Sequence, residues 1–175
     1  NLGTLLQKIS KRKKGATLFA YHVNDPHRFG VVDFNNKNII TSIDEKPIKP
    51  KTNYAVTGLY FYDNSVIDKV KKLKPSKRGE LEITDLNKIY LNEKKLKVEF
   101  LGRGSAWLDT GTHETLLEAG KFVQIVENRQ GLKIACLEEI SYKNKWINKK
   151  NILKKIKFLK NSNYGNYLKR LLDNK

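Results

Sequence analysis

The nine residues from Tyr54 to Tyr62 constrain the fold of this 175-residue chain more than any other stretch. Most of them are aromatic or β-branched and only Gly58 interrupts them, which is the composition of a strong strand. A glycine inside such a strand indicates close approach of a ligand or of another backbone, although packing alone can also require it. Shorter runs predict further strands at residues 16–23, 30–34, 39–43 and 97–101, of which 30–34 and 39–43 form a hairpin. A short strand ending at Leu108 and a last one at 132–135 are also predicted.

Between and after these strands, apolar residues recur at helical spacing. This spacing predicts helices at residues 2–9, 65–73, 83–93 and 112–129, the last of which is ended by Gly131, and through most of 138–175. Alternating strands and helices are typical of an α/β fold, here a mixed sheet flanked by helices with a helical tail. We expect residues 1–135 to form one portion and residues 136–175 the tail.

Two helical segments carry apolar stripes with different expectations. The stripe of Leu116, Ala119, Val123 and Val126 is expected to pack in the core. The stripes in the tail need a partner surface, which is either the domain's own sheet or another subunit. The sequence leaves both open.

The segment from Ala106 to Thr112 is the first candidate for chemistry. It is interpreted as a short strand that delivers Asp109 to its carboxyl end, where Gly111 allows a sharp turn and Thr112 caps a new helix. A carboxylate at such a position can hold Mg²⁺ while the helix N-terminus binds a phosphate. The alternative is that Asp109 only forms the turn, where Asp and Thr are common.

A second candidate is the adjacent pair Glu45 and Lys46 at a predicted strand end, where Pro47 stops the strand. The carboxylate can accept hydrogen bonds from hydroxyls while the ammonium donates to a phosphate. An exposed charge pair in a loop is the other interpretation.

The net charge of the chain bears on whether it binds nucleic acid. The net charge is +17, which could indicate a nucleic-acid partner. However, the 35 basic residues comprise 29 Lys and 6 Arg spread along the whole chain, whereas base readout and phosphate clamps favour clustered Arg. A compositional bias toward Lys, Asn and Ile is the simpler explanation.

The apolar runs, the start of the chain and the cysteine count indicate the cellular compartment. No apolar run is long enough to span a membrane, and the polar, basic start lacks the apolar core of a secretory signal. The single cysteine, Cys136, excludes an internal disulfide and a multi-thiolate metal site. We therefore expect a soluble, cytoplasmic protein.

Four collinear segments carry a resemblance to a known family. Together with their spacing they resemble the bacterial glucose-1-phosphate thymidylyltransferases, whose fold is a Rossmann-like nucleotidyltransferase sandwich. The segments are residues 53–63 (NYAVTGLYFYD), 78–85 (RGELEITD), 102–113 (GRGSAWLDTGTH) and 129–133 (RQGLK).

The resemblance implies that this chain is the C-terminal portion of such an enzyme. Family members carry about a hundred residues upstream, with a glycine-rich nucleotide loop and a second Mg²⁺-binding aspartate. The chain has no methionine and opens within a predicted helix, which agrees with a missing upstream segment. We expect it to be inactive alone.

The activity implied by the resemblance is Mg²⁺-dependent transfer of dTMP from dTTP to glucose 1-phosphate. The products are dTDP-glucose and pyrophosphate, in the first step toward dTDP-rhamnose for lipopolysaccharide O-antigen. The family is usually homotetrameric.

Roles are carried over from the family by position. The implied catalytic residues are Asp109, which would also be the metal ligand, Arg78 and Lys46. The implied substrate-binding residues are Phe29, Gly30, Glu45, Lys46, Val56, Gly58 and Trp107. The implied regulatory residues are Glu139, Ile140 and Lys143.

Three departures from the family pattern stand out. Phe29 replaces a common Tyr, which removes a hydroxyl contact to the sugar. The segment from Cys136 to Ile140 lacks a frequent proline. Lys143 replaces a frequent Arg and cannot form a bidentate phosphate clamp, which places end-product inhibition in doubt.

Two other functions stay open at this point. One is a non-catalytic module that binds or senses a sugar nucleotide. The other, less favoured, is a basic nucleic-acid-binding protein.

Overall fold

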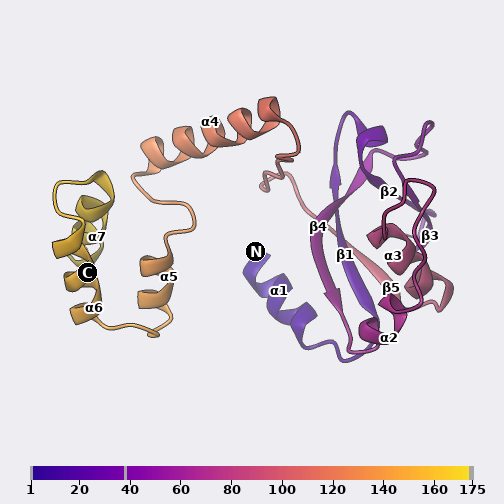
Figure 1. Ribbon diagram of the computed structural model, residues 1–175, viewed down its shortest axis with the longest axis horizontal. Coiled ribbons are helices and arrows are strands. Elements are labelled where there is room, and N and C mark those ends of the chain that lie inside the picture. The colour runs from indigo at the N-terminus through magenta and orange to yellow at the C-terminus, as the bar shows by residue number, and fades with distance from the viewer. Residues whose placement is uncertain (1, 38, 174–175) are drawn as a thin grey trace. The chain divides into compact units, whose positions relative to one another are not determined.

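The computed structural model describes residues 2–37 and 39–173. The chain divides into two compact units, residues 1–107 and residues 108–175, and each is described by itself (Figure 1). The described strands all lie in the first unit. The division predicted after residue 135 stays a prediction. No helix within residues 2–37 and 39–173 is long and apolar enough to cross a membrane.

The first unit is built on a mixed five-stranded sheet, as expected for an α/β fold. Its strand order is β3-β2-β4-β1-β5, with β1 antiparallel to β4 and parallel to β5. The strands are β1 (Ala16–His22), β2 (Gly30–Phe34), β3 (Ile40–Glu45), β4 (Tyr54–Tyr62) and β5 (Leu96–Phe100). Strands β2 and β3 form the predicted hairpin, whose connection includes residue 38, outside the described residues.

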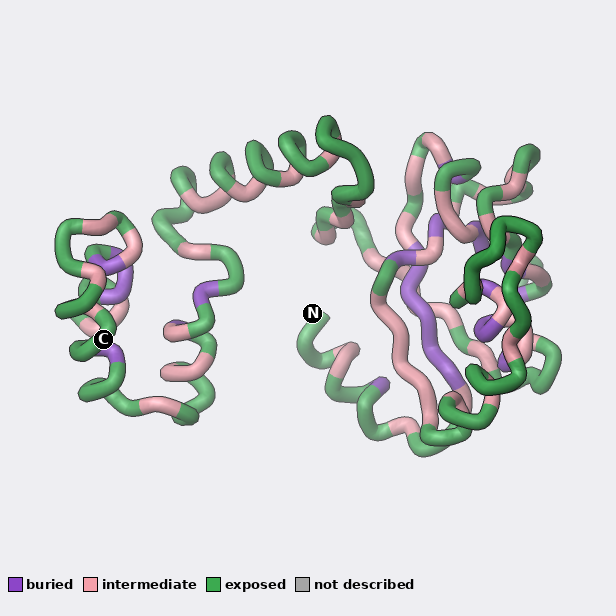
Figure 2. Tube along the Cα trace, in the orientation of Figure 1, coloured by how far each residue is buried: buried purple, intermediate pink, exposed green. Residues whose placement is uncertain are grey.

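Helices cover both faces of this sheet (Figure 1). Ala16 of β1 packs with Leu86 and Tyr90 of α3 (Ile83–Asn92), whereas the next residue, Thr17, accepts a hydrogen bond from Arg12, which follows α1 (Leu2–Ser10). Successive strand residues point to opposite faces, so α1 and α3 lie on opposite sides. The first five residues of β1 are buried between them (Figure 2). The short elements η1 (Pro26–Arg28) and α2 (Val66–Val70) complete the unit.

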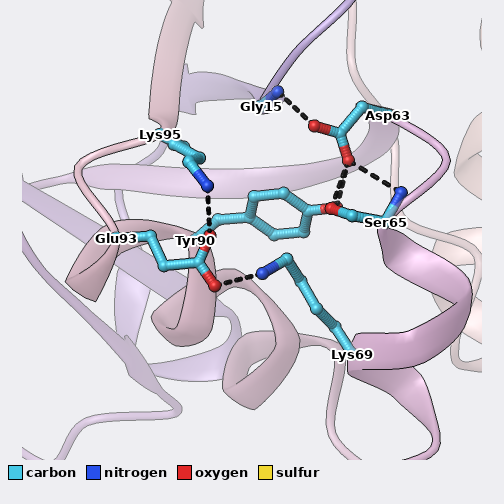
Figure 3. A network of polar contacts seen from close by, with 7 residues as sticks. All are labelled: Gly15, Asp63, Ser65, Lys69, Tyr90, Glu93 and Lys95. Carbon is cyan, nitrogen blue, oxygen red and sulfur yellow. Dashed lines mark hydrogen bonds and ion pairs between the residues drawn. The ribbon is translucent and has the colours of Figure 1, made fainter.

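A polar network fixes the end of β4 (Figure 3). The Asp63 carboxylate accepts hydrogen bonds from the Gly15 amide, the Ser65 amide and hydroxyl, and the Tyr90 hydroxyl. These bonds, chiefly those from Ser65 and then Gly15, lower the pKa of Asp63 to about 2.

Asp63 therefore predicts a pH-dependent stability. Its folded-state pKa lies below its unfolded value, so it stabilises the fold above about pH 4, and this contribution is lost as the pH falls toward 2. After allowance for solvent screening it amounts to about 1 to 2 kcal/mol at pH 7. We expect Asp63→Asn to lower the free energy of unfolding in urea by that amount at pH 7 and by much less at pH 2.5. Asp68→Asn, at an exposed site, is the control; a deficit for Asp63→Asn that did not change with pH would contradict this assignment.

The second unit consists of helices. Their bounds are α4 (His113–Gln130), α5 (Leu137–Lys143), α6 (Lys149–Phe158) and α7 (Asn163–Asp173). Thr112 caps α4 in a capping box with Thr115, and Gly131 ends it in the left-handed conformation, as the sequence predicts. A small core of Cys136, Ile152, Tyr167 and Leu168 holds α5, α6 and α7 together, so the tail stripes pack at least partly on one another.

Three predictions about elements are wrong. Residues 106–108 form no strand, because within the described residues no strand pairs with them. Residues 132–135 form no strand either: the Ile134 amide bonds the Glu127 side chain and Ala135 is left-handed, with φ of 54°. The stripe on α4 is not core, since no residue of α4 is buried and Leu116 is 55% exposed.

Candidate sugar-phosphate site

The pair Glu45 and Lys46 lies beside the start of β2. Gly30 pairs with Glu45 in the β2–β3 register, and the Lys46 amide donates to the Phe29 carbonyl at 3.0 Å. Lys46 has φ of 44°, a left-handed conformation that is uncommon for lysine and occurs at functional sites. The sheet therefore brings together four residues that the sequence nominated, Phe29, Gly30, Glu45 and Lys46.

This group lies at the carboxyl end of β1. Val31 of β2 pairs with Ala55 of β4, and Ala55 pairs with Tyr21 near the end of β1. The carboxyl ends of strands are where open α/β sheets bind ligands.

The Glu45 carboxylate is held by a hydroxyl of α3. The Thr84 hydroxyl, at the start of α3, donates to Glu45 Oε2 at 2.6 Å. A Cβ added at Gly30 would lie 3.3 Å from both Glu45 Oε2 and Thr84 Oγ1, so a glycine is the residue that leaves this contact undisturbed. Burial, with a smaller effect of the Glu45 charge, raises the pKa of Tyr60 to about 12.

Arg78 reaches the same carboxylate from the loop before α3. Its Nη1 lies 3.9 Å from Glu45 Oε1, 3.6 Å from Glu82, and its Nη2 donates to Glu80 at 2.9 Å. The loop turns at Gly79, which has φ of 79°. Arg78 and Glu45, which are 33 positions apart in the sequence, thus belong to one site.

An aromatic wall flanks the start of β2. The Trp107 ring meets the Phe29 ring edge-on with centroids 5.0 Å apart, and the centroid of the Tyr21 ring lies 6.1 Å from that of Trp107. Tyr21 also donates to the Ser105 carbonyl, which ties the Trp107 segment to β1. Aromatic faces next to polar groups are suited to the apolar faces of a sugar ring.

Two further nominated residues lie on β4. Val56 Cβ is 3.8 Å from the Cβ position of Gly30, so Val56 belongs to the same group. A Cβ at Gly58 would meet no atom of the described chain within 4 Å, so no packing there requires glycine. The close approach of a ligand at Gly58 stays a prediction.

Asp109 belongs to the second unit, and its proximity to Glu45 stays a prediction. Locally it lies just before the capped start of α4, as expected. Its carboxylate folds toward Gly111, where an added Cβ would lie 3.2 Å from Oδ2. Within the described residues, no group of three or more His, Cys, Asp or Glu side chains could hold a metal ion. The role of Asp109 as a ligand of Mg²⁺ stays a prediction.

The three nominated regulatory residues lie on α5. Glu139 is buried and accepts hydrogen bonds from Lys143 and from Tyr167 of α7. Burial is the largest single effect and raises its pKa, but these hydrogen bonds and the charge of Lys143 together lower it. Ile140 is 41% exposed. Their regulatory role is untested and stays a prediction.

Sequence reasoning did not nominate some residues of the site. They are Thr84, Tyr60, Ser76 and Glu82. Glu82 and Thr84 stand within the run from Arg78 to Asp85 that carried the resemblance, but the contact of Thr84 with the Glu45 carboxylate depends on how α3 docks beside β3.

Comparison with known proteins identifies the family of the chain. Residues 1–125 match the family described as nucleotidyl transferase. The chain belongs to the nucleotidyl transferase family. The resemblance inferred from the four segments is thereby confirmed.

Relatives within this nucleotidyl transferase family are closely similar. The chain is 54% identical over 167 residues to a glucose-1-phosphate thymidylyltransferase of Neisseria meningitidis serogroup A, covering 95% of this chain and 58% of that protein. It is 49% identical over 172 residues to one of Mycobacterium tuberculosis, covering 98% and 59%. The chain thus spans less than two thirds of the length of these relatives.

Solved structures agree with this assignment. A crystal structure described as a glucose-1-phosphate thymidylyltransferase from Bacillus anthracis in complex with a sucrose matches with a TM-score of 0.61 and 43% identity, covering 68% of this chain and 47% of that one. A UDP-glucose pyrophosphorylase complexed with UDP-glucose, at 22% identity and a TM-score of 0.56, shares the fold.

Proposed function

We propose that this nucleotidyl transferase chain supplies the sugar-phosphate half of a glucose-1-phosphate thymidylyltransferase. The main support for this proposal is that Glu45, Lys46 and Arg78 lie together near the Phe29 and Trp107 rings. A carboxylate for hydroxyls, two cations for a phosphate and an aromatic wall form the recognition set that a hexose 1-phosphate requires.

The proposed reaction needs alignment more than covalent chemistry from the protein. A phosphate oxygen of glucose 1-phosphate attacks the α-phosphorus of dTTP in line, the bond to the pyrophosphate leaving group breaks, and dTDP-glucose forms. Lys46 and Arg78 hold the attacking phosphate and offset its repulsion from the triphosphate. Glu45 accepts hydrogen bonds from sugar hydroxyls and fixes the ring orientation.

Mg²⁺ is part of this proposal. When bound, it would neutralise phosphate charge, and Asp109 is the residue of this chain that would hold it. Asp109 would otherwise act only as a turn residue before α4. The nucleotide loop would come from the upstream segment that the resemblance implies.

The cellular setting is also proposed, from the family resemblance. The product dTDP-glucose would feed dTDP-rhamnose and O-antigen synthesis in the cytoplasm. The α5 residues Glu139, Ile140 and Lys143 would lie in a regulatory site, and the apolar faces of α4 would be covered in a homotetramer.

Binding to this chain tests the proposed site. We expect calorimetric titration with glucose 1-phosphate to show binding, and glucose without the phosphate to bind at least tenfold more weakly, because two cations lose their partner. Binding of glucose and of glucose 1-phosphate with equal affinity would contradict the phosphate role of Lys46 and Arg78.

The Thr84 contact gives a second prediction at this site. Thr84→Val keeps the side-chain shape but leaves Glu45 Oε2 without its donor, so we expect affinity for glucose 1-phosphate to fall about tenfold. Thr84→Ser keeps the hydroxyl and is the matched control, expected within about threefold of the parent chain. Equal affinities for the two variants in the same titration would show that the hydroxyl has no role.

A further inference from the structure

Arg78 contacts three carboxylates, and their environments differ. The Glu80 side chain is 61% exposed and accepts from Arg78 Nη2 at 2.9 Å. The Glu82 side chain is only 13% exposed and lies 3.6 Å from Arg78 Nη1. Glu45, the proposed sugar ligand, is 3.9 Å from the same Nη1.

Glu82 is also held by a group other than the Arg78 guanidinium. The Ser76 hydroxyl donates to Glu82 Oε1 at 2.9 Å and accepts from the Arg78 amide at 3.2 Å. Although Glu82 precedes α3, its side chain does not cap the helix. One hydroxyl thus fixes both the backbone of Arg78 and the carboxylate beside its guanidinium.

Glu80 has no comparable anchor. Its backbone carbonyl accepts from the Ser76 amide, but its carboxylate projects into solvent with Arg78 as its ion-pair partner. An exposed pair of this kind contributes little to stability and is screened by salt. A phosphate can therefore displace Glu80 from Arg78 at small cost.

We propose that Glu82 is a positioning residue that orients Arg78 for the sugar phosphate, whereas Glu80 is a counter-ion that the phosphate displaces. The inference rests on the proposed function, because it assigns Arg78 to the phosphate of glucose 1-phosphate. It assigns different roles to Glu80 and Glu82, two acidic residues of one loop.

Electrostatics makes the two roles separable. Removing either carboxylate takes one negative charge away from the neighbourhood of the phosphate. Long-range electrostatics alone would therefore tighten anion binding in both cases. A loss of affinity on removing Glu82 therefore requires loss of orientation. A positioning effect is also insensitive to salt, unlike the removal of an exposed competing charge.

The test is calorimetric titration of the chain with glucose 1-phosphate at low and high salt. We expect Glu80→Gln to lower the Kd about two- to threefold at low salt, with little effect at high salt. We expect Glu82→Gln to raise the Kd about tenfold at both salt concentrations. In the Arg78→Gln background, Glu82→Gln should cause no further loss, which a general structural effect would not reproduce.

Thermal unfolding checks that each variant is folded. If Glu82→Gln does not fold, Ser76→Ala tests the same inference by removing the hydroxyl that holds Glu82. Ser76→Ala should weaken binding in the same direction as Glu82→Gln. Tighter or unchanged binding by Glu82→Gln, or by Ser76→Ala in its place, would overturn the inference. If Arg78→Gln itself left the affinity unchanged, the phosphate role of Arg78 in the proposed function would fail instead.

Discussion

Asp109→Asn is expected to reduce turnover by about a thousandfold in an enzyme completed by the upstream segment of a relative. Two unit charges at about 4 Å interact by roughly 4 kcal/mol at an effective dielectric of 20, and a loss of that size corresponds to about three orders of magnitude in rate. The amide keeps the size of the carboxylate, so the fold should persist. The measurement is pyrophosphate release at saturating Mg²⁺, with circular dichroism as the check on folding.

Glu118→Gln is the matched control for this variant. It removes one exposed carboxylate from the neighbouring helix α4 and should leave turnover within about twofold, as surface changes usually do. Near-normal turnover of Asp109→Asn would assign that residue to the turn before α4 alone.

Gly15→Ala is expected to have the largest effect on stability. Gly15 has φ of 89°, and an added Cβ would lie 2.5 Å from the Lys95 carbonyl oxygen. That carbonyl accepts the amide of Ala16 at 2.9 Å, where β1 begins beside β5, so the backbone has to move or lose the bond. We expect a loss of about 3 kcal/mol or more in the free energy of unfolding, measured by urea denaturation.

The loss in Gly15→Ala has two causes, the strain of a positive φ and the clash with the Lys95 carbonyl, and Gly79→Ala measures the first alone. Gly79 also has a positive φ, of 79°, but an added Cβ would meet no atom of the described residues within 4 Å. The cost there should be the conformational strain alone, about 1 kcal/mol. Equal losses at both positions would show that the clash with Lys95 is relieved without cost.

The sequence predicted the elements whose signals are local. Period and composition identified β4, the hairpin and α3, and Thr112 and Gly131 marked both ends of α4. These features depend on neighbours in the chain, so pattern suffices. The strands predicted at 106–108 and 132–135 failed because a strand also needs a partner, which no local pattern supplies.

The site residues also divide into those that a local pattern identifies and those that depend on long-range packing. Glu45 and Lys46 could be nominated because they are adjacent at a strand end and match a family motif. The Thr84 hydroxyl on Glu45, and the unequal burial of Glu80 and Glu82 around Arg78, depend on how the loop before α3 folds against β3. That docking is long-range, and therefore only the structure assigns these residues.

The most direct test is to join this chain to the upstream segment of the Neisseria meningitidis relative and supply dTTP, glucose 1-phosphate and Mg²⁺. The account predicts pyrophosphate and dTDP-glucose in equal amounts, with neither formed by the upstream segment alone and both strongly reduced by Arg78→Gln. A folded fusion that binds dTTP yet releases no pyrophosphate above background would contradict it.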